Sequence, residues 1–516
     1  MRFSKQINFL FKLKQLFYFA TLGLFIIWQV LLPFFGSQNN AYISKVLAFV
    51  VSIFAVLSVA TTLINTSQLT RLAKYFFALT AFAWLVVTIV LYPGIYNFDL
   101  ANVLIPVANN LTRSWGSHIY SSILMVVYPI LPNLFAINLF SVFLLLALVF
   151  RLAKNFPPQS GFKTIVFILI FNLPVLHLFL NCSYRDIVAS LISALLIEIL
   201  FRVYKNGALS VYEFIEICTF TTICILTKGD HMHYLIVVPL ALWIYAFKNS
   251  RKSKILYSLT IFLLPLAVSF LYEINKIEMK NTYKLSLLWN PLNEIIYTRD
   301  AEIPESDKKV ISTIINYDYL KNNHDPYEIE GFHKREYKIK FPQQDFNQLL
   351  KVYLSLAWQH WDIFLQNRVK IFLRANELAG PSYLYQDQLN QWNEHVNKYV
   401  KGLEIAYPTF NTDTKSNYFT FIEKHIRSNQ VLAAFLTGTA VFVFIFIINA
   451  FLVYRKNQYH IIFQLIFFRL LLVFLSAPAY QLKYHGYFLF PNLAFLICAL
   501  ALYEPSIKAS KPTGAS

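Results

Sequence analysis

The feature that most constrains this chain is a series of apolar runs, each long enough to cross a lipid bilayer as an α-helix. A spanning helix needs about 20 consecutive apolar residues, and 57% of the 516 residues are apolar while 14% are charged. This composition predicts an all-α polytopic membrane protein. We expect about twelve transmembrane helices, near residues 15–35, 43–64, 73–92, 134–151, 163–181, 185–204, 211–227, 231–247, 254–272, 431–453, 459–478 and 484–503.

Positive charge is concentrated around these runs. The formal net charge is +18, but residues 273–430 contain 20 basic and 20 acidic side chains and are neutral. The excess therefore flanks the membrane runs, as the positive-inside rule predicts for cytoplasmic ends, and this argues against nucleic-acid binding. We expect both termini in the cytoplasm. The charges alternate correctly only when the short apolar segment 118–132 does not cross, so 99–132 is predicted to be interfacial or re-entrant on the outer face.

The neutral region divides the chain into three predicted parts. Residues 1–272 form an N-terminal transmembrane module, whose first outer loop is 93–132. Residues 273–430 form a large extracytoplasmic α or α+β domain, and 431–516 form a C-terminal transmembrane module. Within the domain, 353–374 has the pattern of one amphipathic helix lying on the membrane surface. All four cysteines lie in or beside apolar runs, so we expect no disulfide framework.

Seven acidic residues lie outside the domain, and three of them stand apart by position. Asp99, Asp186 and Asp230 fall at predicted outer ends of spans, although a carboxylate inside a bilayer is costly. Three aspartates on one face suggest a polar cavity that opens outward, while helix capping or contact with water is the alternative. The other four lie at or near predicted cytoplasmic ends and are interpreted as solvated or snorkelling: Glu198, Glu213, Glu216 and Glu504.

Basic and imidazole side chains accompany these aspartates, against the usual scarcity of positive charge on the outer face. Arg185 precedes Asp186, and the segment TKGDHMHY (227–234) surrounds Asp230 with a lysine and two histidines. A phosphate ligand would explain the cations, and so would ordinary ion pairs. A divalent cation is a further alternative. The ligands available to it are Asp99, Asp186, His231 and His233.

The stretch YPGIYNFDLANVLIPVANNLTRSWGSHIYSSILMVVY (92–128) resembles the first outer loop of bacterial GT-C-type glycosyltransferases. These are integral membrane enzymes related in architecture to protein O-mannosyltransferases. Trp115 and His118 match the start of the next helix without its proline pair. Three further segments are similar to family motifs. Residues 180–202 resemble the second acidic motif, and 484–502 resemble a helix start of the form Arg-Tyr-x-x-Pro. Residues 226–245 resemble a segment that carries basic-Asn-Gly in the family, where this chain has Lys-Gly-Asp.

The resemblance implies a glycosyltransferase that takes a sugar from a polyprenyl-phosphate donor. The acceptor would be an envelope glycan, lipid or protein on the outer face of the bacterial cytoplasmic membrane, and the reaction would invert the anomeric centre. Asp99 matches the catalytic acid position and Asp186 the second acid. We expect Asp99 to accept the proton of the acceptor hydroxyl. The residues expected to bind phosphate or substrate are Arg185, Lys228, His231, Tyr484, His485, Trp115 and His118.

Two other classes stay open. A polysaccharide polymerase or ligase that acts on lipid-linked glycans also has about twelve spans and a large outer loop, although arginine-dominated outer loops would be expected. A twelve-helix secondary transporter requires polar or broken helices at the bilayer midplane and two related halves. Paired aspartates favour the transferase over the polymerase or ligase. Charges at the outer edge of the membrane and the neutral domain between the helices favour it over the transporter.

Overall fold

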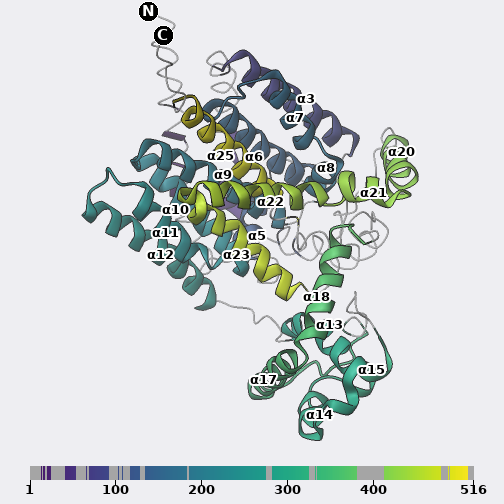
Figure 1. Ribbon diagram of the computed structural model, residues 1–516. Helices are drawn as coiled ribbons and strands as arrows, with labels where there is room; N and C mark the ends of the chain where they lie inside the picture. Colours follow the sequence, from purple (N-terminus) through teal and green to yellow (C-terminus); the bar gives the residue numbers. More distant parts are fainter. Residues whose placement is uncertain are drawn as a thin grey trace, which may run out of the picture.

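The computed structural model is built from α-helices, as Figure 1 shows. Among the residues it describes there is no strand, and extended backbone pairs only in a single bridge between Ile315 and Tyr337. The predicted all-α class is confirmed. The structure describes residues 41–50, 69–91, 117–127, 134–182, 185–274, 282–324, 334–379, 412–477 and 489–509, together with single positions between these stretches.

Within the described ranges, five helices are long and apolar enough to cross a membrane, and two bent helix pairs raise the number to seven when each pair is one span. These helices support a membrane protein but do not reach the twelve predicted spans. The five are α3 (Arg71–Val90), α6 (Leu134–Asn155), α9 (Arg185–Asn206), α12 (Arg251–Ile274) and α23 (His460–Ser476, preceded by η8, Asn457–Tyr459). The pairs are α7 (Gly161–Phe171) with α8 (Pro174–Asn181), bent by 42°, and α21 with η7 (Gln430–Thr437) against α22 (Ala440–Arg455), bent by 61°.

Other predicted spans are short in the structure or fall outside its description. α10 (Val211–Thr227) and α11 (Tyr234–Tyr245) have 17 and 12 residues, below the roughly 20 that a perpendicular crossing needs. α5 (His118–Val127) has ten residues and is too short to cross. Its side chains are buried among other helices, and whether 118–132 crosses the membrane stays a prediction. Most of 15–35 and of 51–64 lies outside the described residues.

The bend between α7 and α8 has a local cause. Pro174 stands in the first turn of α8, and a proline has no N–H with which to continue a helix from α7. Trp84 of α3 donates its indole N–H to the carbonyl oxygen of Phe171 at 2.9 Å, so one of the carbonyls at the end of α7 gains a partner. Hydropathy indicates one apolar run here, whereas Pro174 divides the run into two helices.

The membrane helices pack around α9, which is buried along most of its length. It contacts α6, α10, α11, α23 and α25 (Leu489–Ala509). A helix enclosed on all sides is apolar all round, and the charged residues of α9 are accordingly confined to its two end regions. Arg185 and Asp186 open the helix, and Glu198, Arg202 and Lys205 lie in its C-terminal half.

A second hydrophobic core lies in the chain between the membrane helices, in a cluster that we call the peripheral domain (Thr282–Ala375). Figure 1 shows this domain joined to the membrane helices through α18. Trp289 is fully buried at its centre. The domain consists of α13 (Thr282–Arg299), η5 (Asp300–Glu302), α14 (Glu305–Ser312), α15 (Tyr317–Asn322), α17 (Gln343–Gln359) and α18 (Trp361–Ala375).

The single amphipathic helix predicted over 353–374 is wrong, because the chain breaks at His360. There the backbone leaves the helical conformation (φ −113°, ψ 44°), and the buried His360 ring lies 3.8 Å from Glu302. The turn allows both α17 and α18 to send side chains into the domain core, Leu356 before the break and Ile363 after it. Farther along, α20 (Thr412–Phe421) packs beside the membrane core instead.

Candidate functional site

Charged side chains from four segments meet where α9 begins and α10 ends. Lys228 Nζ lies 2.5 Å from Asp186 Oδ1 and 3.6 Å from Asp230 Oδ2. Arg469 Nη1 lies 2.9 Å from the same Asp230 oxygen. Acids and bases therefore alternate in the order Asp186, Lys228, Asp230 and Arg469. We call the whole group the charged cluster: Arg185, Asp186, Lys228, Asp230, His231 and Arg469.

The backbone explains why these side chains converge. Asp186 is in the first turn of α9, where the helix dipole favours a carboxylate. Lys228 ends α10 in an extended conformation, and the 3₁₀ turn η4 (Gly229–His231) then reverses the chain into α11. The His233 ring joins this turn to α23, because its nitrogens lie 3.0 Å from the Asp230 carbonyl and 3.2 Å from the Leu465 carbonyl.

The cluster is largely removed from solvent. Arg469 and His231 are each 1% exposed and Asp186 is 6% exposed, whereas Asp230 keeps 31% of its side-chain surface. Arg469 Nη1 also lies 3.4 Å from His231 Nδ1. Charges at such depth persist in proteins when they are paired. Among the residues that the structure describes, the cations of this cluster are Arg185, Lys228 and Arg469, and the acids are Asp186 and Asp230.

Electrostatics differ for the two groups in the turn between α10 and α11. Burial alone would raise the pKa of Asp230, but the charges of Arg469 and Lys228 outweigh it and hold that pKa well below its usual range. Asp230 is therefore ionised at neutral pH. Burial lowers the pKa of Lys228 below its ordinary value, although Asp186 and Asp230 oppose this change. Lys228 thus gives up its proton more readily than an exposed lysine.

Ser117 fixes the start of α5 beside this turn. Its φ of 74° is left-handed, which is uncommon for serine. The hydroxyl donates to the Leu226 carbonyl at 2.6 Å, two residues before Lys228, and accepts from the Tyr120 N–H at 3.3 Å. Strained backbone of this kind gathers at functional sites, where the surroundings hold it in place. The buried Tyr120 lies within the electrostatic field of Asp186 and Arg185.

The structure brings four of the predicted site residues together, namely Arg185, Asp186, Lys228 and His231. The Arg185 charge acts on Asp186, Lys228 and Asp230, which places it in the same group. His118 opens α5, but its side chain is outside the described part. The remaining predicted residues also lie outside the described residues: Asp99, Trp115, Tyr484 and His485.

A divalent cation gains no support from the ligands that the structure describes. In that part of the chain, no three His, Cys, Asp or Glu side chains are arranged to hold a metal ion. Asp186 is engaged by Lys228, and His231 lies beside Arg469. His233 is directed to two backbone carbonyls. Asp99 lies outside the description, so its contribution stays a prediction.

Arg469 is the functional candidate that sequence reasoning missed. It lies inside the apolar run IIFQLIFFRLLLVF of α23, and it ranks among the largest fully buried side chains. The signal was present, because an ionisable residue within a membrane helix is by default a candidate for function. Arg469 is distant from both ends of its run, so its position does not mark it as part of an outer end.

A second charged group lies toward the other end of α9. The Glu198 side chain is fully buried and lies 3.7 Å from Arg151 and 3.4 Å from Arg202, and Asn155 donates to it at 2.7 Å. Arg151 also forms two hydrogen bonds with Glu216. The interpretation of Glu198 as a snorkelling residue is therefore wrong. Glu198 of α9 is buried and contacts Arg151 and Asn155 of α6. Arg151 in turn contacts Glu216 of α10.

Comparisons with known proteins assign no family to this geometry. No family model, no curated protein and no solved structure matches the chain. The charged cluster and the resemblance of its segments to GT-C motifs are the two grounds on which a function is inferred.

Proposed function

We propose that the protein is a GT-C-type glycosyltransferase that uses a polyprenyl-phosphate-linked sugar at the outer face of the bacterial cytoplasmic membrane. The charged cluster carries this proposal. Arg185 and Lys228 supply cations where α9 begins and α10 ends, and Arg469 adds one from within α23. The phosphate of a prenyl lipid would lie near these helix ends. Charged donors form the strongest hydrogen bonds to phosphate, and arginine can contact two of its oxygens at once.

In the proposed reaction, Asp99 accepts the proton of an acceptor hydroxyl. The acceptor oxygen bonds to the anomeric carbon from the side opposite the phosphate. The carbon–oxygen bond to the phosphate breaks, and the lipid phosphate leaves with that electron pair, which inverts the anomeric centre. Lys228 and Arg469 stabilise the negative charge that develops on the phosphate. Asp186 and Asp230 position these cations, because each carboxylate already accepts a contact from one of them.

The proposal includes twelve spans, cytoplasmic termini and an outer peripheral domain. The two ends of α9 support this orientation. Arg151, Arg202 and Lys205 gather toward one end, as the positive-inside rule expects of the cytoplasmic side. The charged cluster lies at the opposite end of the same helix. A phosphate-binding site there would face outward, on the side to which flipped lipid-linked sugars are delivered.

A secondary transporter is the second candidate, because two observations favour it. The pairs α7–α8 and η7–α22 are bent, and broken spans are typical of transporter binding sites. Arg469 is also a buried charge inside α23. A polymerase or ligase would share recognition of a lipid phosphate and would differ in its product, a longer glycan instead of one added sugar.

Binding of a prenyl lipid tests the site without knowledge of the sugar. The purified full chain is titrated with a long-chain polyprenyl phosphate and with the matching polyprenol, and complexes are counted by native mass spectrometry. We expect the phosphate to bind more tightly than the alcohol, and Lys228→Gln and Arg469→Gln each to remove that preference. Lys254→Gln, on the first turn of α12, is the matched control. Equal binding of phosphate and alcohol by the wild type would refute the proposed site.

Catalysis is tested separately at Asp99. Membranes containing wild type or Asp99→Asn are supplied with radiolabelled polyprenyl-phosphate sugars, and label in the acceptor is measured. We expect Asp99→Asn to bind the prenyl phosphate normally and to lose transfer, by roughly 100-fold or more for removal of a general base. Undiminished transfer would exclude Asp99 as the base. Movement of an unmodified solute by the wild type in proteoliposomes would favour the transporter.

A further inference from the structure

A line of large apolar side chains is exposed on the peripheral domain. We call these five residues the apolar stripe: Leu354, Trp358, Trp361, Leu365 and Val369. The two tryptophans are 82% and 61% exposed, on either side of the break at His360. Single exposed hydrophobic residues are ordinary on protein surfaces, whereas a contiguous set marks a surface that meets another apolar phase.

The stripe follows from helix periodicity. Leu354 and Trp358 are four residues apart on α17, and Trp361, Leu365 and Val369 repeat at the same spacing on α18, so each set lies on one helix face. Other faces of the same helices fill the domain core. The stripe is therefore surplus to the folding of the domain within the described structure.

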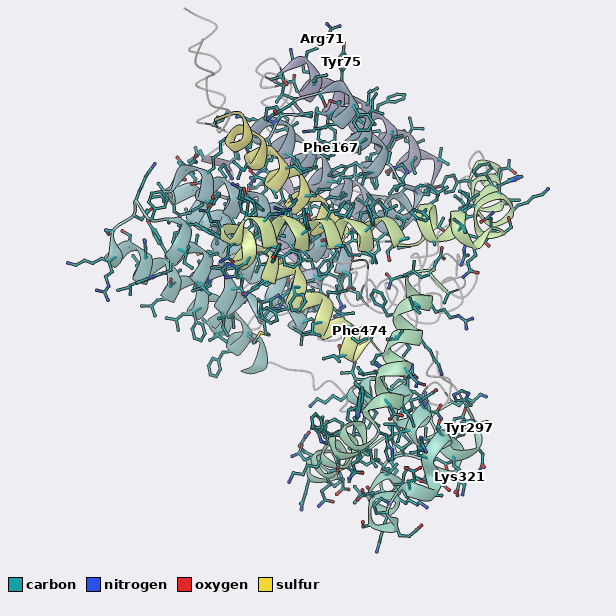
Figure 2. The ribbon with its side chains drawn as sticks, viewed as in Figure 1. Arg71, Tyr75, Phe167, Tyr297, Lys321 and Phe474 are labelled. Atoms are coloured by element: carbon teal, nitrogen blue, oxygen red, sulfur yellow. The ribbon has the colours of Figure 1, made fainter. Side chains whose placement is uncertain are left out.

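The helix that carries three residues of the stripe, α18, packs against the end of α23. Arg368 donates to the Ala477 carbonyl at the end of α23 at 2.9 Å, and the Phe372 and Phe474 rings meet with centroids 5.9 Å apart. Figure 2 shows Phe474 at the end of α23, beside α18. Around Phe474, on the last turns of α23, Leu471, Leu472 and Leu475 are exposed, as side chains that face lipid are.

Side chains next to the stripe suit the interfacial region of a bilayer. Tryptophan is enriched at that depth because its ring is apolar and its N–H is polar. Lys351 is exposed one turn before Leu354. Lys370, beside Val369, keeps 41% of its side-chain surface and pairs with Glu294 at 2.9 Å. Lysines at the edge of an apolar face are typical of surfaces that rest on lipid headgroups.

From the exposure of the stripe and the packing of α18 against α23 we infer that the apolar stripe binds the lipid bilayer surface on the side of the membrane where the peripheral domain lies. Trp358 and Trp361 enter the headgroup region, and α18 lies along the membrane instead of standing free in solvent. The lipid contact adds to the protein contacts that hold the domain, through Arg368 and Phe372, at the end of α23. The inference is independent of the proposed transferase reaction.

Depth-dependent quenching tests this contact in the full chain. The four native cysteines are all buried, so a single introduced cysteine gives one accessible thiol for an environment-sensitive fluorophore. The probe positions are Trp358→Cys and Trp361→Cys. The control is Ser306→Cys on the exposed part of α14. The proteins are reconstituted into nanodiscs whose lipids carry bromine near the headgroup or carry none. We expect brominated lipid to reduce the emission of probes at 358 and 361 and to leave the probe at 306 unchanged.

Two results would overturn the inference. One is quenching at 358 and 361 that does not exceed quenching at 306. The other is energy transfer between labelled copies at 361 without lipid quenching, which would assign the stripe to a contact between two chains. Thermal unfolding of each labelled variant identifies any that fail to fold. Leu354→Cys provides a further probe on α17 should either tryptophan variant be lost.

Discussion

Arg469 of α23 and Asp230 of the turn between α10 and α11 form an ion pair with 2.9 Å between Nη1 and Oδ2. The arginine comes from the predicted C-terminal membrane module and the aspartate from the N-terminal one. The contact therefore joins the two modules at the charged cluster. A substitution that removes the charge of one partner is therefore expected to leave the other partner without this ion pair.

Loss of the Asp230 carboxylate is expected to destabilise the protein through the charge it leaves behind. Asp230→Asn removes one carboxylate partner of the buried Arg469, and removing one partner of a buried ion pair costs up to about 3–5 kcal/mol. We expect the double variant Asp230→Asn with Arg469→Gln to be more stable than Asp230→Asn alone. Thermal unfolding in detergent measures both. Asp318→Asn, on the exposed surface of α15, is the matched control and should change the unfolding temperature little. If the effects of Asp230→Asn and Arg469→Gln on stability are strictly additive, the two residues are not coupled.

The same pair predicts how stability depends on pH. The folded-state pKa of Asp230 is below the ordinary value, about 3.9. A depressed carboxyl pKa contributes stability that is complete above the unfolded value and is lost as pH falls through the folded one. The difference in unfolding temperature between wild type and Asp230→Asn should therefore be constant from about pH 8 to 5 and shrink below about pH 4. A change in that difference between pH 5 and 8 would show that another group controls it.

Sequence reasoning located the charged cluster in part. Charges at the ends of apolar runs are conspicuous, so Arg185, Asp186 and Lys228 could be grouped from position alone, and the structure places them together. Arg469 was missed because its partners are distant in the sequence and no end of a run lies near it. Which residues meet across modules depends on helix packing, which hydropathy does not contain.

The fold was predictable at the level of class and not of individual spans. Apolar content predicts helices, and helices are what the structure has. It does not reveal where a helix bends, since Pro174 and His360 act through backbone geometry and local partners. The burial of Glu198 could not be predicted either, because the local sequence around Glu198 does not show that Arg151 of α6 contacts it.

Glu198 is expected to matter for stability and not for binding of a prenyl phosphate. Its side chain is fully buried between Arg151 and Arg202. Glu198→Ala should lower the free energy of unfolding by about 1–3 kcal/mol, because both arginines and Asn155 lose a buried partner while the arginines keep Glu216. Glu305→Ala removes an exposed carboxylate from a pair with Lys308 and should cost about 0–1 kcal/mol. Equal unfolding temperatures for the two variants would contradict the assigned role of Glu198.

The last prediction concerns Gly207 in the turn after α9, which is bonded to the segment before α12. Gly207 has φ +67°, and its carbonyl accepts from the Lys248 N–H at 2.8 Å. A Cβ at Gly207 would lie 2.4 Å from the Phe247 ring, which is exposed and able to move, so backbone strain dominates the cost. Gly207→Ala should lower the free energy of unfolding by about 1–2 kcal/mol.

The matched control for Gly207 is Gly161, the first residue of α7. It has ordinary backbone angles, and a Cβ there meets nothing within 4 Å. Gly161→Ala should leave stability unchanged or raise it slightly, because alanine favours a helix over glycine by about 0.5–1 kcal/mol. Phe247→Ala combined with Gly207→Ala separates the two contributions. Full recovery in that double variant would show that the ring contact, and not the left-handed backbone, sets the cost.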